Sequence, residues 1–356
     1  MPKLFEQKNQ CFGCEACAAA CPTGAVTMQR DAEGFAYPVI SESLCMECGA
    51  CESVCPAQQP LSQVPNKAFA VRCKDPDVLY QSTSGGAFSL IADAVIADGG
   101  VVCGACFDET FAVVHKVSTD FAPMRKSKYI QSSIGKCYEE IRQVLQSGRK
   151  VLFTGTPCQC HAAKAFFGKA DGLLIASVVC RGVMAPGFWE RYIGWISQNG
   201  DLSAYCFRDK RRNDDAHTVA YTVGGKETAT PFLSDPFSRI YVKCLALRES
   251  CYACPYCFPD KDFDFTIGDF WGVENVFPEF ADGKGTSLVL AGSDEALRLL
   301  ERIKNNATVS EVTAELPLQE ALRKPAATNP MLKKLFARDA ANAACGMDMI
   351  LKKYGC

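Results

Sequence analysis

The sequence predicts a two-part protein, in which a small cysteine-rich α+β module precedes a larger α/β body with a mixed sheet. Eight of the 22 cysteines lie within residues 11–55, in two copies of one spacing. Between residues 67 and 197, short apolar strands alternate with helical stretches, which is typical of α/β proteins. A hairpin pattern at 101–117 adds antiparallel pairing to this arrangement. The length of 356 residues suits about two domains.

Composition and charge exclude several classes of protein. Hydrophobic residues make up 48% and charged residues 22%, which excludes a disordered chain. The 38 Lys and Arg against 40 Asp and Glu give a net charge of −2, so we expect no nucleic-acid partner. Residues 1–10 contain no apolar signal region, and no apolar run reaches about 18 residues, so we expect a cytoplasmic protein without a membrane span. Disulfides are rare in the cytoplasm, and the cysteines therefore indicate metal or redox chemistry.

The N-terminal cysteines follow the run found in bacterial ferredoxins. Each copy reads Cys-x2-Cys-x2-Cys-x3-Cys-Pro, and in such runs the fourth cysteine ligates the cluster of the other copy. The module is therefore predicted to be ferredoxin-like and to hold two 4Fe-4S clusters. The first cluster is expected to take Cys11, Cys14, Cys17 and Cys55. The second is expected to take Cys45, Cys48, Cys51 and Cys21.

A pair of zinc sites is the alternative interpretation of these cysteines. Zinc sites made only of cysteine usually consist of two separated Cys-x2-Cys pairs. Two complete runs, each ending in Cys-Pro, favour iron–sulfur clusters instead. The stretch 58–65 (QQPLSQVP) has the composition of a linker and ends the module.

The body is predicted to alternate strands and helices as far as residue 197. Two loops precede helices and could hold phosphate, Ser82–Gly86 and Gly155–Pro157, because a helix N-terminus favours an anion. Taken singly, each loop is more often only a helix cap. The expected strands are 67–72, 101–107, 111–117, 151–154 and 173–179. The expected helices are 88–97, 138–146 and 188–197, together with one that the loop 155–159 opens and that ends at about residue 167.

A third group of cysteines lies in the body, at Cys251, Cys254 and Cys257. Their spacing suits three ligands of one cluster, and a fourth thiolate must come from elsewhere. Cys158 and Cys180 are candidates, because each is expected where a strand meets a loop, the usual place for sites in α/β sheets.

Seven motifs follow one another along the chain, namely the double ferredoxin run, STSGG (82–86), SKYIQS (127–132), VLFTGTPCQ (151–159), CRGV (180–183), LRESCYACP (247–255) and TIGDFWG (266–272). Their order resembles that of the coenzyme F-420 hydrogenase/dehydrogenase beta subunits, a family that the sequence matches over residues 11 to about 290. The resemblance implies an FAD-binding α/β body with an additional 4Fe-4S cluster beside the flavin. The family includes proteins that exchange hydride with the deazaflavin coenzyme F-420 and relatives that use other substrates.

The resemblance also implies particular site residues and domains. It assigns the third cluster to Cys158, Cys180, Cys251 and Cys254, with Cys257 as a competitor for one position. It places a set of loop residues around the flavin and its phosphates, namely Ser84, Gly85, Gly86, Lys128, Tyr129, Gln131 and Thr156. The domains then expected are a ferredoxin domain at 1–62, an N-terminal region of the beta-subunit type at 67–150, a C-terminal region of that type with the third cluster at 151–290 and a helical extension at 291–356.

The function expected from these parts is conversion between hydride and single-electron transfer, because clusters pass electrons singly and a flavin exchanges them singly or in pairs. The expected partners are a soluble one-electron carrier or redox subunit, and a hydride carrier or small organic substrate. Two other interpretations remain open. One is a ferredoxin-dependent reductase of a different organic or inorganic acceptor. The other is an electron-relay subunit without catalysis of its own.

A few other polar and cysteine residues have simpler interpretations. Cys103 and Cys106 lie in an apolar strand and are expected to be buried structural thiols. His161 is interpreted as a surface or capping residue rather than a proton donor. The stretch Lys210–Arg212 is interpreted as a solvated charged turn. For Asp269, the resemblance favours a site residue over a residue that only caps a turn.

Overall fold

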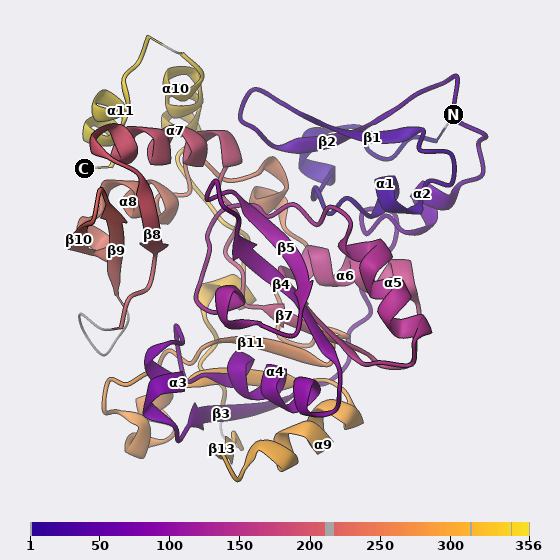
Figure 1. Ribbon diagram of the computed structural model, residues 1–356, viewed down its shortest axis with the longest axis vertical. Helices are drawn as coiled ribbons and strands as arrows, with labels where there is room; N and C mark the ends of the chain where they lie inside the picture. The colour runs from indigo at the N-terminus through magenta and orange to yellow at the C-terminus, as the bar shows by residue number, and fades with distance from the viewer. Residues whose placement is uncertain (1, 211–216, 314, 343, 356) are drawn as a thin grey trace.

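A computed structural model describes residues 2–210, 217–313, 315–342 and 344–355 (Figure 1). It contains an N-terminal module and an α/β body. The helices are α1 (Ala16–Ala20), α2 (Ala50–Ser53), α3 (Pro76–Tyr80), α4 (Ala87–Ala97), α5 (Cys137–Gln146), α6 (Pro157–Phe167), α7 (Pro186–Ile196), α8 (Pro236–Val242), α9 (Asp294–Ile303), α10 (Pro330–Ala341) and α11 (Met347–Tyr354). The strands are β1 (Val26–Arg30), β2 (Ala36–Ile40), β3 (Lys67–Cys73), β4 (Val101–Phe107), β5 (Val113–Ser118), β6 (Val151–Gly155), β7 (Leu173–Val178), β8 (Leu202–Cys206), β9 (Thr218–Val223), β10 (Lys226–Pro231), β11 (Phe265–Asp269), β12 (Ser287–Ala291) and β13 (Ala307–Glu311).

The N-terminal module combines one hairpin with two very short helices. Strands β1 and β2 pair antiparallel, and the Asp31 carboxylate fixes the turn between them by accepting from the amides of Glu33 and Phe35 at 3.0 Å. Helices α1 and α2 each follow a residue in the left-handed region, Glu15 (φ 62°) and Gly49 (φ 72°). These turns place both helices directly at the cysteine motifs. The predicted α+β module is therefore confirmed.

The body is built on a mixed sheet with the strand order β13-β3-β12-β11-β7-β6-β4-β5 in the described part of the chain. Strands β4, β6, β7 and β11 run parallel, and the outer strands pair antiparallel on both sides. This confirms the predicted α/β body with a mixed sheet. The central strands are mostly apolar because helices cover both of their faces.

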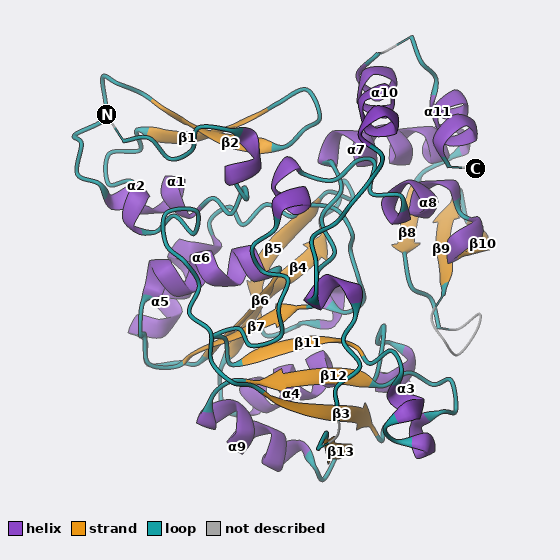
Figure 2. Ribbon diagram, turned by 180° about the vertical axis from the view of Figure 1, so that it is seen from behind, coloured by secondary structure: helices purple, strands orange, loops and turns teal. Residues whose placement is uncertain are grey.

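Alternating side chains of the central strands belong to two different cores. Leu152 and its neighbours on one face pack with helices α4 and α9. Phe153 and its neighbours on the other face pack with α5 and α6. Figure 2 shows the sheet between these pairs of helices. The arrangement places the N-terminal ends of α4 and α6 near the strand ends where the motif loops lie.

A second, smaller sheet is absent from the sequence prediction. Strands β8, β9 and β10 form it in the order β10-β9-β8. It packs with α7, α8, α10 and α11 around an aromatic core, in which Phe188 stacks on Phe237 with ring centroids 5.4 Å apart. Trp189 is buried in the same core.

The C-terminal region differs from the helical extension that the sequence predicts. Residues 307–311 form β13, which pairs with β3 at the edge of the main sheet. Val309 lies opposite Val71 in this pairing. The stretch ATVSE alternates between core and surface over too few residues to show a strand period from sequence alone.

The module packs directly on the body, over α5 and α6 (Figures 1 and 2). The buried Tyr138 hydroxyl donates to the Cys14 carbonyl at 3.0 Å. The amide of Gly135 donates to the Glu15 carboxylate at 2.7 Å, and the amide of Gly187 donates to the Glu33 carbonyl at 3.0 Å. The module is thus held by bonds from several elements and not only by the linker.

Substitution of Gly34 by alanine is expected to destabilise this contact by about 1–3 kcal/mol, the usual cost of overpacking. A Cβ at Gly34 would lie 2.5 Å from the amide nitrogen and 2.9 Å from the Cα of Gly187. Gly24 is the matched control, because it also has a positive φ (67° against 87°) but nothing within 4 Å of an added Cβ. Chemical unfolding of both variants measures the difference. Equal losses of stability in G34A and G24A would mean that backbone strain, and not the close approach, sets the cost.

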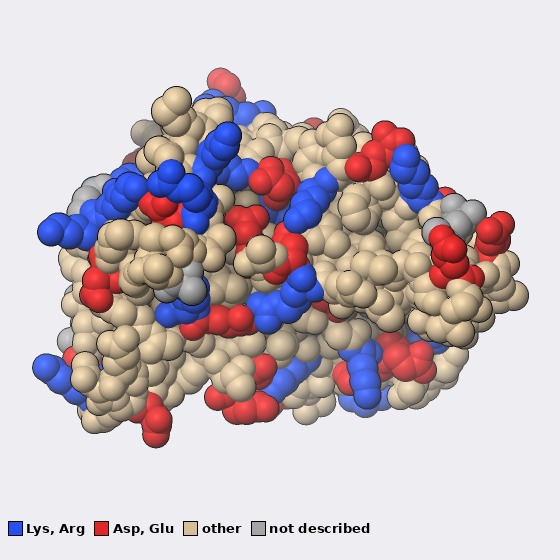
Figure 3. Space-filling model, turned by 90° about the horizontal axis from the view of Figure 1, so that it is seen from above, with Lys and Arg blue, Asp and Glu red and all other residues tan. Residues whose placement is uncertain are grey.

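Charged side chains of both signs are interspersed on the face seen in Figure 3, in keeping with the net charge of −2. Among the described residues, no helix has the length and apolar character that crossing a membrane requires.

Candidate redox centre

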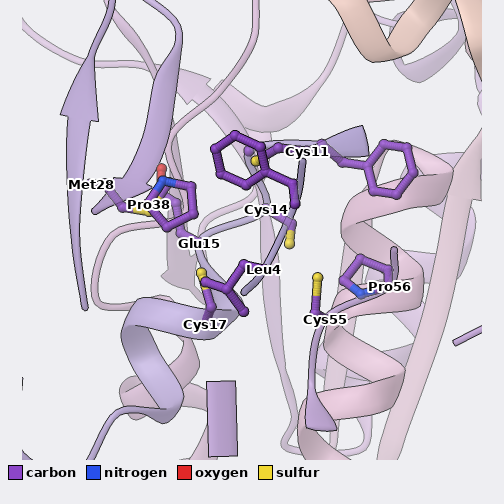
Figure 4. Close-up of a pocket in the computed structure, with 12 residues that line it drawn as sticks. Leu4, Cys11, Cys14, Glu15, Cys17, Met28, Pro38, Cys55 and Pro56 are labelled. Carbon is purple, nitrogen blue, oxygen red and sulfur yellow. The ribbon is translucent and has the colours of Figure 1, made fainter. Parts of the chain in front are cut away.

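The first pocket of the N-terminal module is lined by four cysteines, Cys11, Cys14, Cys17 and Cys55. Figure 4 shows their sulfurs turned toward the same space. Apolar side chains, including Leu4 and Met28, close it. Burial raises the pKa of the Cys17 thiol to about 12, and the neighbouring Cys11 and Cys55 contribute to the increase. Such a crowded set of thiols becomes anionic readily only where a cation compensates the charge, which fits a metal cluster.

The second pocket takes the remaining four cysteines of the module, Cys21, Cys45, Cys48 and Cys51. Each pocket therefore receives its fourth cysteine from the other motif. Cys48 is exposed, whereas Cys14, Cys17 and Cys51 are buried. The second pocket is thus the outer one of the two.

Five cysteines of the body share one neighbourhood. Cys158 lies in the first turn of α6, Cys180 follows β7, and Cys251 lies in a 3-10 helix at Glu249–Ala253. Burial raises the pKa of Cys158 to about 11 and that of Cys251 to about 12. In both cases the charge of Cys254 contributes to the increase.

Cys254 and Cys257 form a hydrogen-bonded pair of sulfurs. This bond raises the pKa of Cys254 and lowers that of Cys257. Both members of the pair interact with Cys180 and Cys251. The structure therefore brings together all the cysteines that the resemblance assigns to a third cluster, and it keeps Cys257 beside them as a competitor.

None of these cysteine groups has the tight convergence of a single-ion site. Among the described residues, no three or more His, Cys, Asp or Glu side chains lie close enough to hold one metal ion.

A cavity of about 870 Å³ lies beside the body cysteines. Cys180 and Gly182 form part of its wall, together with the loops before α4 and α6. Its lining includes five cationic side chains, Arg125, Lys126, Lys128, Arg181 and Arg208, against the two acidic ones, Asp269 and Glu320. Four exposed apolar side chains also line it, namely Val178, Leu233, Val242 and Trp271. A large cavity with excess positive charge and apolar walls suits an anionic ligand that also has an apolar part.

Five of the seven residues that the resemblance places around a flavin line this cavity, namely Ser84, Gly86, Lys128, Tyr129 and Thr156. Gly85 lies behind the loop, where an added Cβ would be 2.2 Å from the Val71 carbonyl oxygen. The Gln131 side chain faces the N-terminal module instead, and its amide donates to the carbonyls of Phe12 and Gly13 at 3.0 and 3.2 Å.

Lys128 holds the loop that forms one wall of the cavity. Its ammonium group donates to the carbonyls of Arg125, Pro123 and Lys126 at 2.7, 2.9 and 3.4 Å. Burial lowers its pKa to about 8. The lysine therefore closes a tight turn of the loop while keeping a positive charge beside the cavity at neutral pH.

Lys210 corrects one sequence interpretation. The sequence suggests a solvated turn, but Lys210 is buried and donates to the carbonyls of Ser84 and Leu79 at 2.6 and 3.2 Å. It thereby fixes the glycine-rich loop before α4. The rest of the proposed turn, Arg211 and Arg212, lies outside the described residues.

His161 is a second correction. The sequence favours a surface or capping residue, but only 6% of His161 is exposed. Its Nδ1 lies 2.9 Å from the Tyr256 hydroxyl, and Tyr256 also packs edge-on against Phe12 of the module. Cys103 and Cys106 are buried in β4, as expected. Asp269 lies in the cavity wall, 3.2 Å from the guanidinium of Arg208.

Sequence reasoning misses Arg208, Arg248 and Tyr256. Tyr256 links the body cysteines to the first pocket, because it follows Cys254 by two residues and its ring packs against Phe12 of the pocket lining, with centroids 5.5 Å apart. Arg248 touches Cys11 directly, with 3.4 Å between Nη2 and Sγ. Only their position in the sequence could have pointed to two of these residues, since Arg248 and Tyr256 lie close to the motif cysteines.

Comparisons with known proteins agree with these features. Residues 10–59 match the 4Fe-4S dicluster domain, and residues 148–315 match the family described as the C terminus of the coenzyme F420 hydrogenase/dehydrogenase beta subunit. The chain is 29% identical over 182 residues to the F subunit of F(420)H(2) dehydrogenase from Methanosarcina mazei. That match covers 46% of this chain and about half, 51%, of the relative.

A solved structure aligns over a larger part of the chain but only weakly. It is a chain of the F420-reducing [NiFe] hydrogenase complex from Methanosarcina barkeri, with 14% identity and a TM-score of 0.49. The alignment covers 83% of this chain and 93% of the other. The motifs, the dicluster module and the family match together lead to one assignment: residues 148–315 of the chain belong to the family of coenzyme F420 hydrogenase/dehydrogenase beta subunits, and a 4Fe-4S dicluster domain precedes them.

Proposed function

We propose that the chain is an iron–sulfur flavoprotein oxidoreductase that converts hydride transfer at FAD into single-electron transfer through three 4Fe-4S clusters. The proposal rests on one observation: the cavity, the body cysteine group and the two pockets of the module adjoin one another in a series. The large cavity shares Cys180 with the body cysteine group, and Tyr256 and Arg248 join that group to the first pocket of the module. Four adjoining sites thus connect the cavity with the exposed Cys48.

The residues around the cavity fit FAD. The N-terminal ends of α4 and α6 open onto it at Gly86 and Thr156, where backbone amides and the helix dipole favour phosphate. The five cationic side chains of the lining exceed its two acidic ones by three, and this excess compensates the charge of a diphosphate. FAD, when bound, accepts electrons in pairs from a hydride donor and releases them singly.

The body cysteines fit a third 4Fe-4S cluster. We assign Cys158, Cys180, Cys251 and Cys254 as its ligands, because all four are partly buried thiols whose charges act on one another. Thr156, whose hydroxyl lies 3.1 Å from the Cys158 sulfur, borders both this group and the cavity. The chain would pass electrons between the cavity and the outer pocket in this order of sites.

The partners follow from the two ends of this route. At the cavity we propose a hydride carrier, with the deazaflavin coenzyme F420 as the first candidate because the matched relative is named as part of an F(420)H(2) dehydrogenase. At the outer pocket we propose a one-electron carrier or a partner redox subunit. The relative is a subunit of a dehydrogenase, which favours a partner redox subunit over a one-electron carrier.

Full-length protein purified without oxygen is expected to release about one FAD per chain on denaturation, identified by chromatography. Mixing with reduced F420 is expected to bleach the bound flavin. A chain that carries its iron but no flavin would favour a relay subunit without its own catalysis. A flavin that is reduced through the clusters but not by reduced F420 would favour a reductase of a different acceptor.

A further inference from the structure

Arg248 is almost completely buried, with 1% of its surface exposed, and it joins the N-terminal module to the body. Its Nε donates to the Cys11 carbonyl at 2.8 Å, and its Nη2 donates to the Ala36 carbonyl at 3.0 Å. The same Nη2 lies 3.4 Å from the Cys11 sulfur. The guanidinium therefore contacts both the backbone and the thiol of a cysteine in the first pocket.

Further contacts fix the plane of the guanidinium. It lies 4.2 Å from the ring centre of Tyr37 and 5.3 Å from that of Phe35. Its Nη1 donates to the Gln131 side-chain oxygen at 2.9 Å, and the Gln131 amide is itself anchored on Phe12 and Gly13. All these partners are neutral groups or a sulfur, and none is a carboxylate. The positive charge is therefore not compensated by an acid in its described contacts.

Arg248 also acts on the body cysteines. Its carbonyl accepts from the amide of Cys251 at 2.9 Å, which ties it to the 3-10 helix that carries this cysteine. Burial raises the pKa of Cys251 and of Cys158, and the positive charge of Arg248 opposes the increase in both cases. One buried cation thus lies between thiols that belong to two different cysteine groups.

We propose that Arg248 is a positioning residue that supplies one shared positive charge to the cluster at Cys11 and the cluster at Cys251, and thereby keeps both reducible. This inference rests on the three-cluster arrangement proposed above. A cluster gains negative charge when it is reduced, so a nearby fixed cation favours the reduced form and raises the reduction potential. The effect is strong here because the guanidinium is removed from water. Gln131 is the residue that orients it.

The test is a redox titration of the full-length, iron-loaded chain followed by electron paramagnetic resonance. R248Q is expected to lower the midpoint potentials of two of the clusters and to leave that of the outer cluster unchanged. R248K, which retains the charge, is expected to keep both potentials close to those of the unmodified chain. R30Q is the matched control, because Arg30 pairs with Glu190 across the same interface but lies half exposed, and it is expected to shift neither.

Two results would overturn the inference. One is R248Q with full iron content and unchanged potentials. The other is an R248K shift as large as that of R248Q, which would assign the effect to geometry and not to charge. If R248Q fails to load iron, the same redox titration is carried out on Q131E. This variant places a carboxylate beside the retained arginine and so offsets its positive charge. Lowered potentials in Q131E support the shared charge, and unchanged ones exclude it. Iron analysis of the unmodified chain separates the two proposals, since about eight iron atoms instead of about twelve would remove the third cluster itself.

Discussion

Replacement of Cys254 by serine is expected to reduce the iron content from about twelve to about eight atoms per chain, because one cubane of four irons is lost. The eight cysteines of the two N-terminal pockets come from residues 11–55 alone, so their clusters are expected to remain. Metal binding of this kind depends on a complete ligand set, and a serine hydroxyl is a poor substitute for a thiolate. Iron and sulfide analysis after anaerobic purification measures the loss.

The neighbouring Cys257 provides the control for this experiment. Its sulfur is hydrogen-bonded to that of Cys254, but it is the less buried member of the pair. C257S is expected to keep about twelve iron atoms, as three clusters require. The reverse pattern, with iron lost only from C257S, would make Cys257 the ligand. Stoichiometric zinc in the unmodified protein would contradict the iron–sulfur assignment of the body cysteines altogether.

Replacement of Lys128 by methionine is expected to weaken flavin retention at least about tenfold while leaving the iron content unchanged. Hydrogen bonds to a charged group contribute about 1.5–3 kcal/mol each, and 1.4 kcal/mol corresponds to a tenfold change in affinity. Methionine removes the bonds to the Pro123 and Arg125 carbonyls together with the charge, so the loop is free to leave the cavity wall. Titration of the flavin-free protein with FAD measures the change.

The same lysine makes flavin retention dependent on pH. Its pKa is lowered to about 8, so it is charged below that pH and neutral above it. FAD affinity is therefore expected to fall as the pH rises through 8 in the unmodified protein and to lose this step in K128M. Lys116, an exposed residue on β5, supplies the control, and K116M is expected to behave as the unmodified chain. An unchanged FAD affinity in K128M would place the flavin outside this cavity.

The sequence alone is sufficient to predict the parts of the fold in which one hydrophobic pattern dominates. The strands β4, β6 and β7 are buried on both faces, so their residues are mostly apolar, and glycine, proline or polar turns mark their ends. The hairpin of β4 and β5 is visible because Asp108 stands in its turn, where it accepts from the amides of Thr110 and Ala112.

The sequence is insufficient where a strand or a side chain depends on distant partners. The strands β8 and β10 are largely exposed, so their residues carry little apolar alternation. Lys210 looks solvated in sequence, yet it is buried because two loop carbonyls satisfy its ammonium group. Arg248 is a single cation in a cysteine motif, and only the packing of the module against the body shows that it contacts Cys11. Charged residues are buried through such pairings, which no local pattern encodes.

The exposure of Cys48 in the outer pocket sets where salt can act most strongly. Dissolved ions screen exposed charges over about 8–10 Å at ordinary ionic strength, and they reach buried groups far less. Residues 31–66 contain five Asp or Glu and no Lys or Arg, so the outer pocket belongs to a segment of one sign. Cys158 and Cys251, by contrast, are only partly exposed. If the proposed route is correct, raising the ionic strength is therefore expected to alter encounters at the outer pocket more than passage between the inner cysteine groups.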